Sequence, residues 1–194
     1  MIEVIFYGRG GQGAVTAAQI LATAVFREGK YSHALPYFRG ERKGAPVLAY
    51  ARISDEPMEV RGAIDNPDIV IILDAALLKT VNPLKSLKPN SLAIINTAKT
   101  PEEIGTLSEN KNIRIDTIDA TALSEKIYGQ SSIPRVNVAM LGHFAACTKA
   151  VKVESILAAV DEYFTGDNAA KAKEGVKLAY SQAIERVKKD RAKT

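Results

Sequence analysis

The chain has 194 residues and a net charge of +4, and hydrophobic residues make up 46% of it. These values are typical of one globular domain with an ordinary core. No apolar run approaches the roughly 18 residues of a membrane span, and no signal peptide is visible at the start. The single cysteine, Cys147, forbids an intrachain disulfide and fits a reducing cytoplasm. It also falls short of the roughly four thiolates of an iron–sulfur cluster.

The first elements are a strand, a glycine turn and a helix. The strand comprises residues 2–7, the turn is Gly8–Gly13, and the helix begins at Ala14. Glycines at the first, third and sixth positions of such a turn let backbone N–H groups approach a phosphate closely. The helix N-terminus adds a partial positive charge at the same place. The pattern indicates a phosphate-bearing ligand; alternatively, the glycines only make a tight turn that packs the helix on the sheet.

The second strand lacks the acid that a dinucleotide site uses. That acid lies at the end of the strand, about 20 residues after the glycines, where it binds the ribose. Glu28 has this spacing but precedes Gly29, a typical end of a helix. The predicted strand Tyr31–Phe38 ends without a carboxylate. The sequence therefore disfavours an NAD-dependent dehydrogenase.

The middle of the chain predicts an antiparallel hairpin and three further strands. Val47–Ile53 and Met58–Val60 flank the turn Ser54–Pro57, which is typical of a β-hairpin. β-Branched runs then predict further strands, the first two of them buried and parallel, at Ile69–Leu73, Leu92–Asn96 and Ile113–Ile118.

Helices are predicted after the strands. Thr100 and Pro101 begin one with a cap and a first-position proline. The remaining apolar spacing predicts helices over Ala120–Tyr128, Val136–Lys149, Val153–Phe164 and Ala169–Lys189. We therefore expect an α/β protein, a three-layer Rossmann-like sandwich with a mostly parallel sheet, an antiparallel hairpin and a helical C-terminus. Residues 1–194 are expected to form one domain, with a helical extension over about 153–194.

No self-sufficient active site is visible. His33 and His143 are far apart, and neither has an acidic residue at metal-ligand spacing, so no metal site and no catalytic residue are expected. Cys147 lies on an apolar helix and is expected to be a small core residue. Asp74 and Asn96 end two predicted strands, where open α/β sheets bind ligands, or they cap the helices that follow.

Four segments together resemble one family. They read GRGGQGAVTAAQILA from Gly8, ALPYFRGERKGAPVLAYARI from Ala34, NPDIVIILD from Asn66, and IPRVNVAMLG from Ile133. The combination is similar to the gamma subunit of 2-oxoacid:ferredoxin oxidoreductases, most closely the pyruvate type (pyruvate synthase). The resemblance covers the chain to about Phe164, and the stretch Glu41–Pro46 is more similar to the pyruvate or branched-chain branch than to the 2-oxoglutarate branch.

The resemblance implies a hetero-oligomeric, cytoplasmic enzyme that is inactive without its other subunits. Such an enzyme converts a 2-oxoacid and coenzyme A to acyl-CoA and carbon dioxide and reduces ferredoxin. It uses thiamine diphosphate, magnesium and [4Fe-4S] clusters, held mainly by the alpha, beta and delta subunits. The gamma part completes the assembly and helps to enclose coenzyme A, so this chain alone is expected to bind none of the cofactors. The chain lacks a thiamine diphosphate motif, which agrees with this division of roles.

The residues expected to face coenzyme A lie in three segments. They are the turn residues Gly8, Arg9, Gly10, Gly11, Gln12 and Gly13, the loop cations Arg42 and Lys43, and Asn137 of the last motif. The loop Arg39–Gly44 holds three cations around Glu41. It either meets a phosphate of coenzyme A, or contacts an acidic patch on a catalytic subunit, or is a solvated surface loop.

Two other classes of protein remain as alternatives. One is a free-standing dinucleotide-binding oxidoreductase, which binding of nicotinamide or flavin by the isolated chain would support. The other is a nucleic-acid-binding protein, because cations gather at Lys188, Lys189, Arg191 and Lys193. No aromatic residue interleaves these cations, so we expect them only to offset the dipole of a helix end, with no nucleic acid and no membrane as partner.

Overall fold

A single mixed sheet organises the chain. The computed structural model describes residues 1–37, 46–60, 62–106, 108 and 112–191, and no helix in these ranges is long and apolar enough to cross a membrane. The strands are β1 (Ile2–Arg9), β2 (Tyr31–Tyr37), β3 (Pro46–Ser54), β4 (Ile69–Ile72), β5 (Leu92–Asn96) and β6 (Arg114–Ile118). Their order is β2-β3-β1-β4-β5-β6. β3 runs antiparallel to both of its neighbours, and β1, β4, β5 and β6 are parallel.

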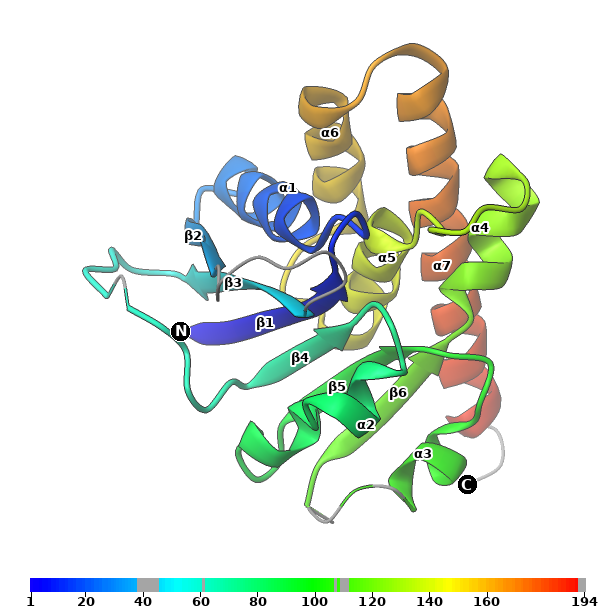
Figure 1. Cartoon of the computed structure of the whole chain (residues 1–194). Helices are drawn as coiled ribbons and strands as arrows, with labels where there is room; N and C mark the ends of the chain where they lie inside the picture. Colours follow the sequence, from blue (N-terminus) through cyan, green and yellow to red (C-terminus); the bar gives the residue numbers. More distant parts are fainter. Residues whose placement is uncertain (38–45, 61, 107, 109–111, 192–194) are drawn as a thin grey trace.

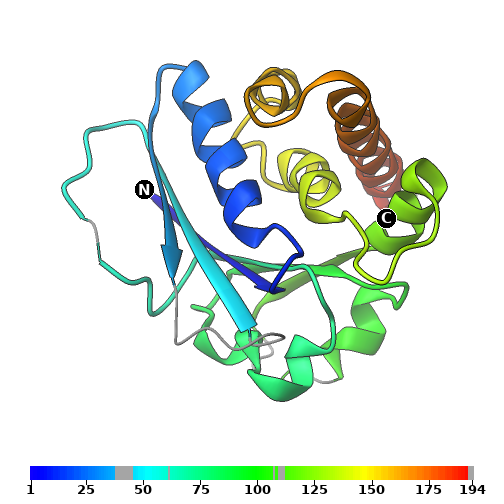
Figure 2. The same ribbon diagram turned by 45° about the horizontal axis from the view of Figure 1, so that its top comes forward.

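Five helices cover one face of the sheet and form what we call the thick layer (Figures 1 and 2). They are α1 (Ala14–Arg27), α4 (Ala120–Tyr128), α5 (Asn137–Thr148), α6 (Val153–Tyr163) and α7 (Gly166–Arg191). α5 is buried along almost its whole length. It approaches α7 so closely that a Cβ atom on Gly142 would lie 2.2 Å from the carbonyl oxygen of Val176. A glycine is therefore required where the two helices meet.

The opposite face carries only short elements, which we call the thin layer (Figure 1). They are α2 (Leu77–Thr80), the 3₁₀ turn η1 (Pro83–Ser86) and α3 (Pro101–Gly105). Strand periodicity divides the core between the layers. Val4 and Phe6 of β1 pack with the thick layer, and Ile5 and Tyr7 pack with the thin one. Over β1, β3 and β2 the thin face is hollowed by a pocket of about 340 Å³ lined in part by Tyr37, Leu48 and Ile64.

A buried arginine fixes the chain on the thin side of β1 and β3. The side chain of Arg52 is 2% exposed, and its Nε lies 3.1 Å from Oε1 of Glu3, the residue opposite it in β1. Its Nη1 and Nη2 donate to the carbonyl oxygens of Gly62 and Ala63 at 2.9 and 3.3 Å. Lys88 bonds the other oxygen of Glu3 at 3.4 Å. This network ties the segment that follows β3 to the sheet.

Most predicted elements are confirmed within one to three residues. Thr100 forms the predicted cap as a full capping box with Glu103. The predicted hairpin at 47–60 is wrong in its second strand, because Met58–Val60 is not a strand. β3 already pairs with β2 on one edge and β1 on the other, so no edge remains for a third partner. The antiparallel hairpin is formed by β2 and β3 instead.

Candidate ligand site at the glycine loop

The glycine loop lies where β1 ends beside β4. The link from β1 passes over the thick layer and the link from β4 passes through the thin layer (Figure 1). Such a switch point opens a crevice at the carboxyl ends of the strands. Gly13 has φ 76° and ψ 29° and serves as the N-cap of α1. This left-handed conformation strongly favours glycine.

Asn137 holds the loop against the start of α5. Its Nδ2 donates to the carbonyl oxygen of Gly13 at 3.3 Å. A Cβ atom on Gly13 would lie 2.5 Å from the same nitrogen, so the amide fills the space that a side chain would need. The predicted site residue Asn137 therefore meets the loop directly, although 124 positions separate it from Gly13.

Arg9 and Gln12 close the loop from inside. Oε1 of Gln12 accepts a hydrogen bond from the backbone N–H of Arg9 at 2.8 Å. The backbone N–H of Gln12 donates to the carbonyl oxygen of Arg9 at 3.0 Å. Nε of Arg9 lies 2.6 Å from Oδ2 of Asp74, which follows β4. The contact is an ion pair rather than an aligned hydrogen bond, because the Nε–H of Arg9 has no acceptor in a suitable direction.

The loop leaves backbone donors unused. Among the described residues, no group accepts a hydrogen bond from the backbone N–H of Gly10, Gly11 or Gly13. Nothing lies within 4 Å of the position of a Cβ atom on Gly10, so the crest of the loop faces open space. These donors and the dipole of the 14-residue helix α1 favour an anion there.

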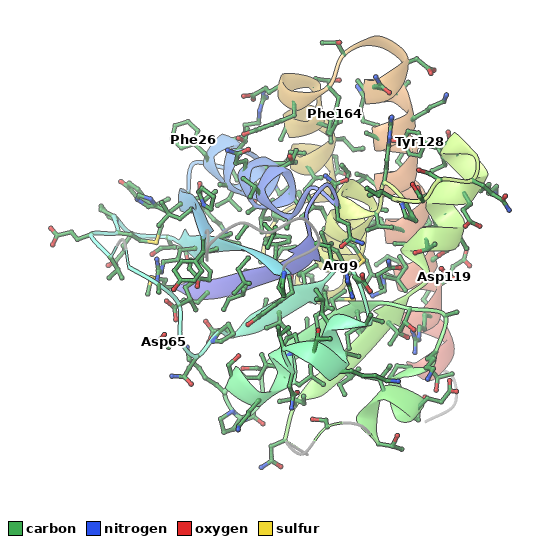
Figure 3. The ribbon with its side chains drawn as sticks, viewed as in Figure 1. Arg9, Phe26, Asp65, Asp119, Tyr128 and Phe164 are labelled. Carbon is green, nitrogen blue, oxygen red and sulfur yellow. The ribbon has the colours of Figure 1, made fainter. Side chains whose placement is uncertain are left out.

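A pocket of about 340 Å³ adjoins the loop. Its lining comes from the loop, α1, the end of α4, the link to α5, and the starts of α5 and α7 with the link between α6 and α7. It comprises Gly11, Gln12, Gly13, Thr16, Tyr128, Arg135, Asn137, Phe164 and Asn168. Two of its lining residues, Tyr128 and Phe164, are labelled in Figure 3. The guanidinium of Arg135 lies 4.9 Å from the ring centre of Tyr128, and its Nη1 donates to Oδ1 of Asn168 at 3.0 Å. Burial raises the pKa of Tyr128, so the phenol stays neutral.

A second pocket of about 330 Å³ lies at the ends of β4 and β5 and shares Gln12 with the first. Asn96 lines it, but the amide of Asn96 already serves the fold. Its Nδ2 donates to the Leu73 carbonyl at 2.9 Å, and its Oδ1 accepts from the backbone N–H of Thr121 at 3.2 Å. Asp74 likewise accepts from the N–H of Ala76 at 2.9 Å. Both strand-end side chains therefore serve the fold, but neither is the N-cap of the helix that follows its strand, which is Ala76 for α2 and Thr100 for α3.

The structure gathers seven of the predicted site residues at this loop, namely Gly8–Gly13 and Asn137. Arg42 and Lys43 lie outside the described residues. Sequence reasoning missed Thr16, Tyr128, Arg135 and Asn168, which come from four separate segments. Of these, only Arg135 could have been predicted from the sequence, because it lies two residues before Asn137 in the last motif.

Residues 3–182 match the family of pyruvate ferredoxin/flavodoxin oxidoreductases. The chain belongs to this family. It is 43% identical to a pyruvate/ketoisovalerate oxidoreductases common subunit gamma from Thermococcus kodakarensis, over 95% of this chain and 98% of the relative. It is 44% identical to the pyruvate synthase subunit PorC of Methanothermobacter marburgensis, over 94% and 97%.

The fold agrees with a solved member. The crystal structure of the pyruvate oxidoreductase subunit PORC from Thermotoga maritima superposes with a TM-score of 0.80 at 31% identity, and the match covers 93% of this chain and 95% of the other. The resemblance in the four motifs is thereby confirmed: this is a gamma-type subunit of a 2-oxoacid:ferredoxin oxidoreductase. As such it is one subunit of a multisubunit oxidoreductase.

Proposed function

We propose that this gamma-type chain completes a cytoplasmic pyruvate:ferredoxin oxidoreductase and encloses coenzyme A in it. The complex converts pyruvate and coenzyme A to acetyl-CoA and carbon dioxide, and the released electrons reduce ferredoxin. The similarity to a pyruvate synthase subunit supports pyruvate as the substrate. The alternative of a free-standing dinucleotide enzyme lacks support, because β3 separates β2 from β1, and β2 brings no acid to the loop.

The alpha, beta and delta subunits are proposed to hold thiamine diphosphate, magnesium and the [4Fe-4S] clusters. One cysteine in 194 residues supports this for the clusters, since each cluster requires about four thiolates. Ferredoxin then meets the complex away from this chain. We expect the purified chain to be folded but unable to reduce viologen with pyruvate and coenzyme A, and turnover by the chain alone would contradict this division.

The pocket beside the glycine loop carries the proposal for coenzyme A. Its open backbone donors suit a phosphate, and Arg135 supplies a permanent cation at the rim. The face of Tyr128, and the side chains of Thr16 and Asn168, suit the base and sugar of a nucleotide. The other subunits would close the open side.

Arg135→Met tests this pocket in the assembled complex. A charge-assisted hydrogen bond contributes about 1.5–3 kcal/mol, so we expect the KM for coenzyme A to rise about 10- to 100-fold. The KM for pyruvate should stay unchanged. Arg27→Met is the matched control, because Arg27 is an exposed arginine at the far end of α1. An unchanged KM for coenzyme A in an intact complex would reject Arg135 as a ligand.

Gly10→Val tests the loop itself. Because its Cβ would meet open space, the variant should fold and still block close approach of a phosphate. Gly13→Val is a poorer test, since the new side chain would strike Asn137 without any ligand. We expect Gly10→Val to weaken coenzyme A binding while thiamine-dependent decarboxylation of pyruvate persists. If coenzyme A kinetics do not change, the loop is only a structural turn.

The loop cations Arg42 and Lys43 remain a proposal with two versions. Loss of coenzyme A affinity in Arg42→Ala, in an intact complex, would assign the loop to the substrate. Loss of subunit association in size-exclusion chromatography would assign it to the interface. If Arg42→Ala and Lys43→Ala both leave the two quantities unaltered, the loop is a solvated surface feature.

A further inference from the structure

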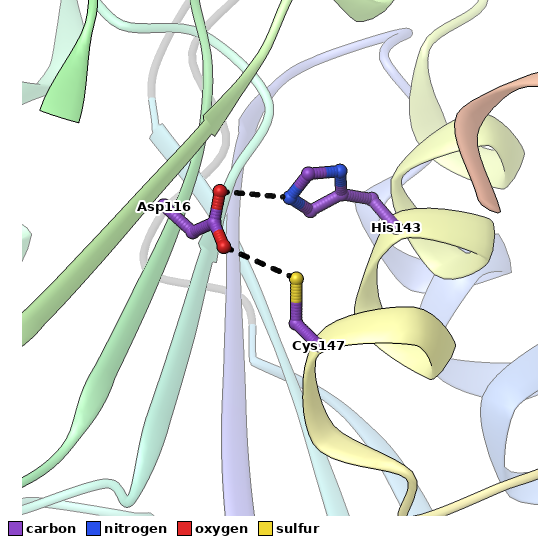
Figure 4. A group of neighbouring side chains, drawn as sticks. All are labelled: Asp116, His143 and Cys147. Atoms are coloured by element: carbon purple, nitrogen blue, oxygen red, sulfur yellow. Dashed lines mark hydrogen bonds and ion pairs between the residues drawn. The ribbon is translucent and has the colours of Figure 1, made fainter. Parts of the chain in front are cut away.

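Asp116, His143 and Cys147 form a compact cluster between β6 and α5, separate from the glycine loop. Nε2 of His143 lies 3.2 Å from Oδ1 of Asp116, and Sγ of Cys147 lies 3.2 Å from Oδ2. One ligand atom from each residue can be chosen so that all three lie within 4.8 Å of one another. Figure 4 shows His143 and Cys147 one turn apart on α5, both directed at the carboxylate of β6.

The imidazole of His143 is buried without a hydrogen-bond partner. Its side chain is 3% exposed, and among the described residues neither Nδ1 nor Nε2 has a partner of suitable geometry. The contact of Nε2 with Asp116 is close enough for an ion pair, but its direction does not make a hydrogen bond. Buried polar atoms are satisfied in the great majority of native structures, so an unpartnered ring aimed at two further ligand atoms needs an explanation.

We propose that Asp116, His143 and Cys147 bind a zinc ion. A thiolate, an imidazole and a carboxylate are the three ligand types that Zn²⁺ takes in proteins, at about 2.0–2.3 Å each. Tetrahedral ligands at such distances lie about 3.3–3.8 Å apart. The imidazole and the thiol each lie 3.2 Å from an oxygen of Asp116, one from Oδ1 and the other from Oδ2. With one atom taken from each residue, the three ligand atoms lie within 4.8 Å of one another, so a small rotation of the side chains would complete the site. The i, i+4 spacing of His143 and Cys147 places both on one face of α5.

A solvent molecule would supply the fourth ligand. A pocket of about 280 Å³ is lined by His143 together with Lys99, Thr117 and Arg186, so solvent can approach the imidazole, although Asp116 and Cys147 do not line it. Three protein ligands with an open fourth position are typical of zinc sites that keep a bound water. The single cysteine makes a closed four-thiolate site in one chain impossible.

Two cations oppose the metal and set its affinity. Nη1 of Arg186 lies 3.5 Å from Oδ1 of Asp116 and donates to the Thr117 carbonyl at 3.0 Å. Arg114 donates to the Cys147 carbonyl at 3.0 Å. In the absence of a metal ion, these guanidinium groups stabilise the ends of β6 and α5 around the site. They would have to be screened or to move when a divalent cation binds. Arg186 would compete more strongly, because it lies beside Oδ1 of Asp116, an oxygen atom that the metal could use.

Binding must displace the proton of the Cys147 thiol. Burial, followed by the charge of Asp116, raises the pKa of the Cys147 thiol to about 12, so the thiol is protonated in the absence of metal. Burial acts to raise the pKa of Asp116 too, but its close contacts with His143, Cys147 and Arg186 outweigh burial and lower that pKa. The carboxylate is thus ionised already, and the thiol proton passes to solvent as the Zn–S bond forms.

Cobalt titration of the full chain tests the site directly. After chelation, Co²⁺ should produce a thiolate-to-cobalt charge-transfer band with one equivalent, and Zn²⁺ should remove it. The band can come only from Cys147, the single thiol. It should disappear in Cys147→Ser, and His143→Ala should weaken binding by at least about tenfold. His33→Ala, which removes the only other histidine, is the matched control and should bind normally.

Two further results decide between a metal site and a buried hydrogen-bonded triad. Arg186→Gln removes the competing cation and should increase Co²⁺ affinity several-fold, whereas a triad without metal predicts no binding in any variant. Circular dichroism should show that each variant is folded. Absence of the band in the folded natural chain at micromolar Co²⁺ would overturn the proposal.

Discussion

The two faces of the sheet are stabilised in different ways. On the thick layer, the helices pack on the strands through apolar side chains. The backbones of α5 and α7 meet at Gly142, where there is no room for a side chain. On the thin layer the apolar cluster is smaller, and a buried arginine holds the chain over β1 and β3. One face of the sheet is therefore stabilised by close apolar packing, and the other by a smaller apolar cluster together with a buried ion pair.

Substitutions in the two layers should reduce the stability of the fold for different reasons. Apolar packing loses free energy in proportion to the group removed and the cavity that remains. A buried charge network fails abruptly, because removing one partner leaves the other charge desolvated and unpaired. The layers should thus respond differently to the same kind of change.

The largest expected effect is that of Arg52→Met on the thin layer. The substitution keeps much of the side-chain volume but leaves the Gly62 and Ala63 carbonyls without their donor, and Glu3 retains Lys88 as its charged partner. We expect a loss of about 3–5 kcal/mol in the free energy of unfolding, measured by denaturant titration. Adding Glu3→Gln should recover part of the loss, because it removes the carboxylate charge that has lost its buried partner. A loss below about 1 kcal/mol would show that the network is dispensable.

Ile71→Ala and Ile72→Ala compare the two layers at neighbouring positions of β4. Both side chains are fully buried, and Ile71 packs with the thick layer while Ile72 packs with the thin one. Each should cost about 2–5 kcal/mol. Ile72→Ala should lie near the lower end, because the short elements α2 and η1 can move into the cavity. Equal losses in urea titrations would mean that the thin layer is as rigid as the thick one.

Gly142→Ala tests the tight packing of the thick layer. The added methyl would lie 2.2 Å from the Val176 carbonyl oxygen, so α5 and α7 must separate. Overpacking of this kind costs about 1–3 kcal/mol. The matched control is Gly105→Ala, where nothing lies within 4 Å of the new carbon, and which should leave the thermal midpoint nearly unchanged. A stable Gly142→Ala would show that the helices have slack.

The smallest effect should come from Arg27→Ala. Arg27 and Glu162 join α1 to α6 at 2.6 Å, but their side chains are 45% and 48% exposed. The pair is expected to contribute about 0–1 kcal/mol and to weaken further with added salt. It is the exposed counterpart of the buried Arg52–Glu3 pair. A loss comparable to that of Arg52→Met would contradict the view that burial, rather than the pairing of charges, sets the effect.

Local pattern predicted the fold where one residue type decides the outcome. The turn before α1 requires a glycine at Gly13, and Thr100 caps a helix as predicted. The β-branched run of β5 has its predicted bounds. The pairing of β3 was not predictable, because an alternating strand followed by a turn favours a local hairpin, and only the occupied edges exclude one. The turns α2 and η1 have four residues each, too short for a periodic signal.

The sites divide in the same manner. The glycine loop is contiguous in sequence, so its residues were named in advance. Its pocket partners Tyr128 and Asn168 come from separate helical segments, and no spacing connects them to Gly11. For the cluster around His143, the i, i+4 spacing of Cys147 was visible, but Asp116 lies 31 positions before the thiol and is brought there only by the sheet.

The bond from Asn137 to Gly13 also bears on the order in which the chain folds. A contact across 124 positions closes only after the intervening strands have paired, and such long-range contacts form slowly. During synthesis, β1 and α1 emerge well before α5. The glycine loop would therefore acquire its final shape late, after most of the sheet exists. A nascent or truncated chain that lacks α5 should have the loop sequence without its final geometry, so a ligand of the loop would not act as a template for early folding.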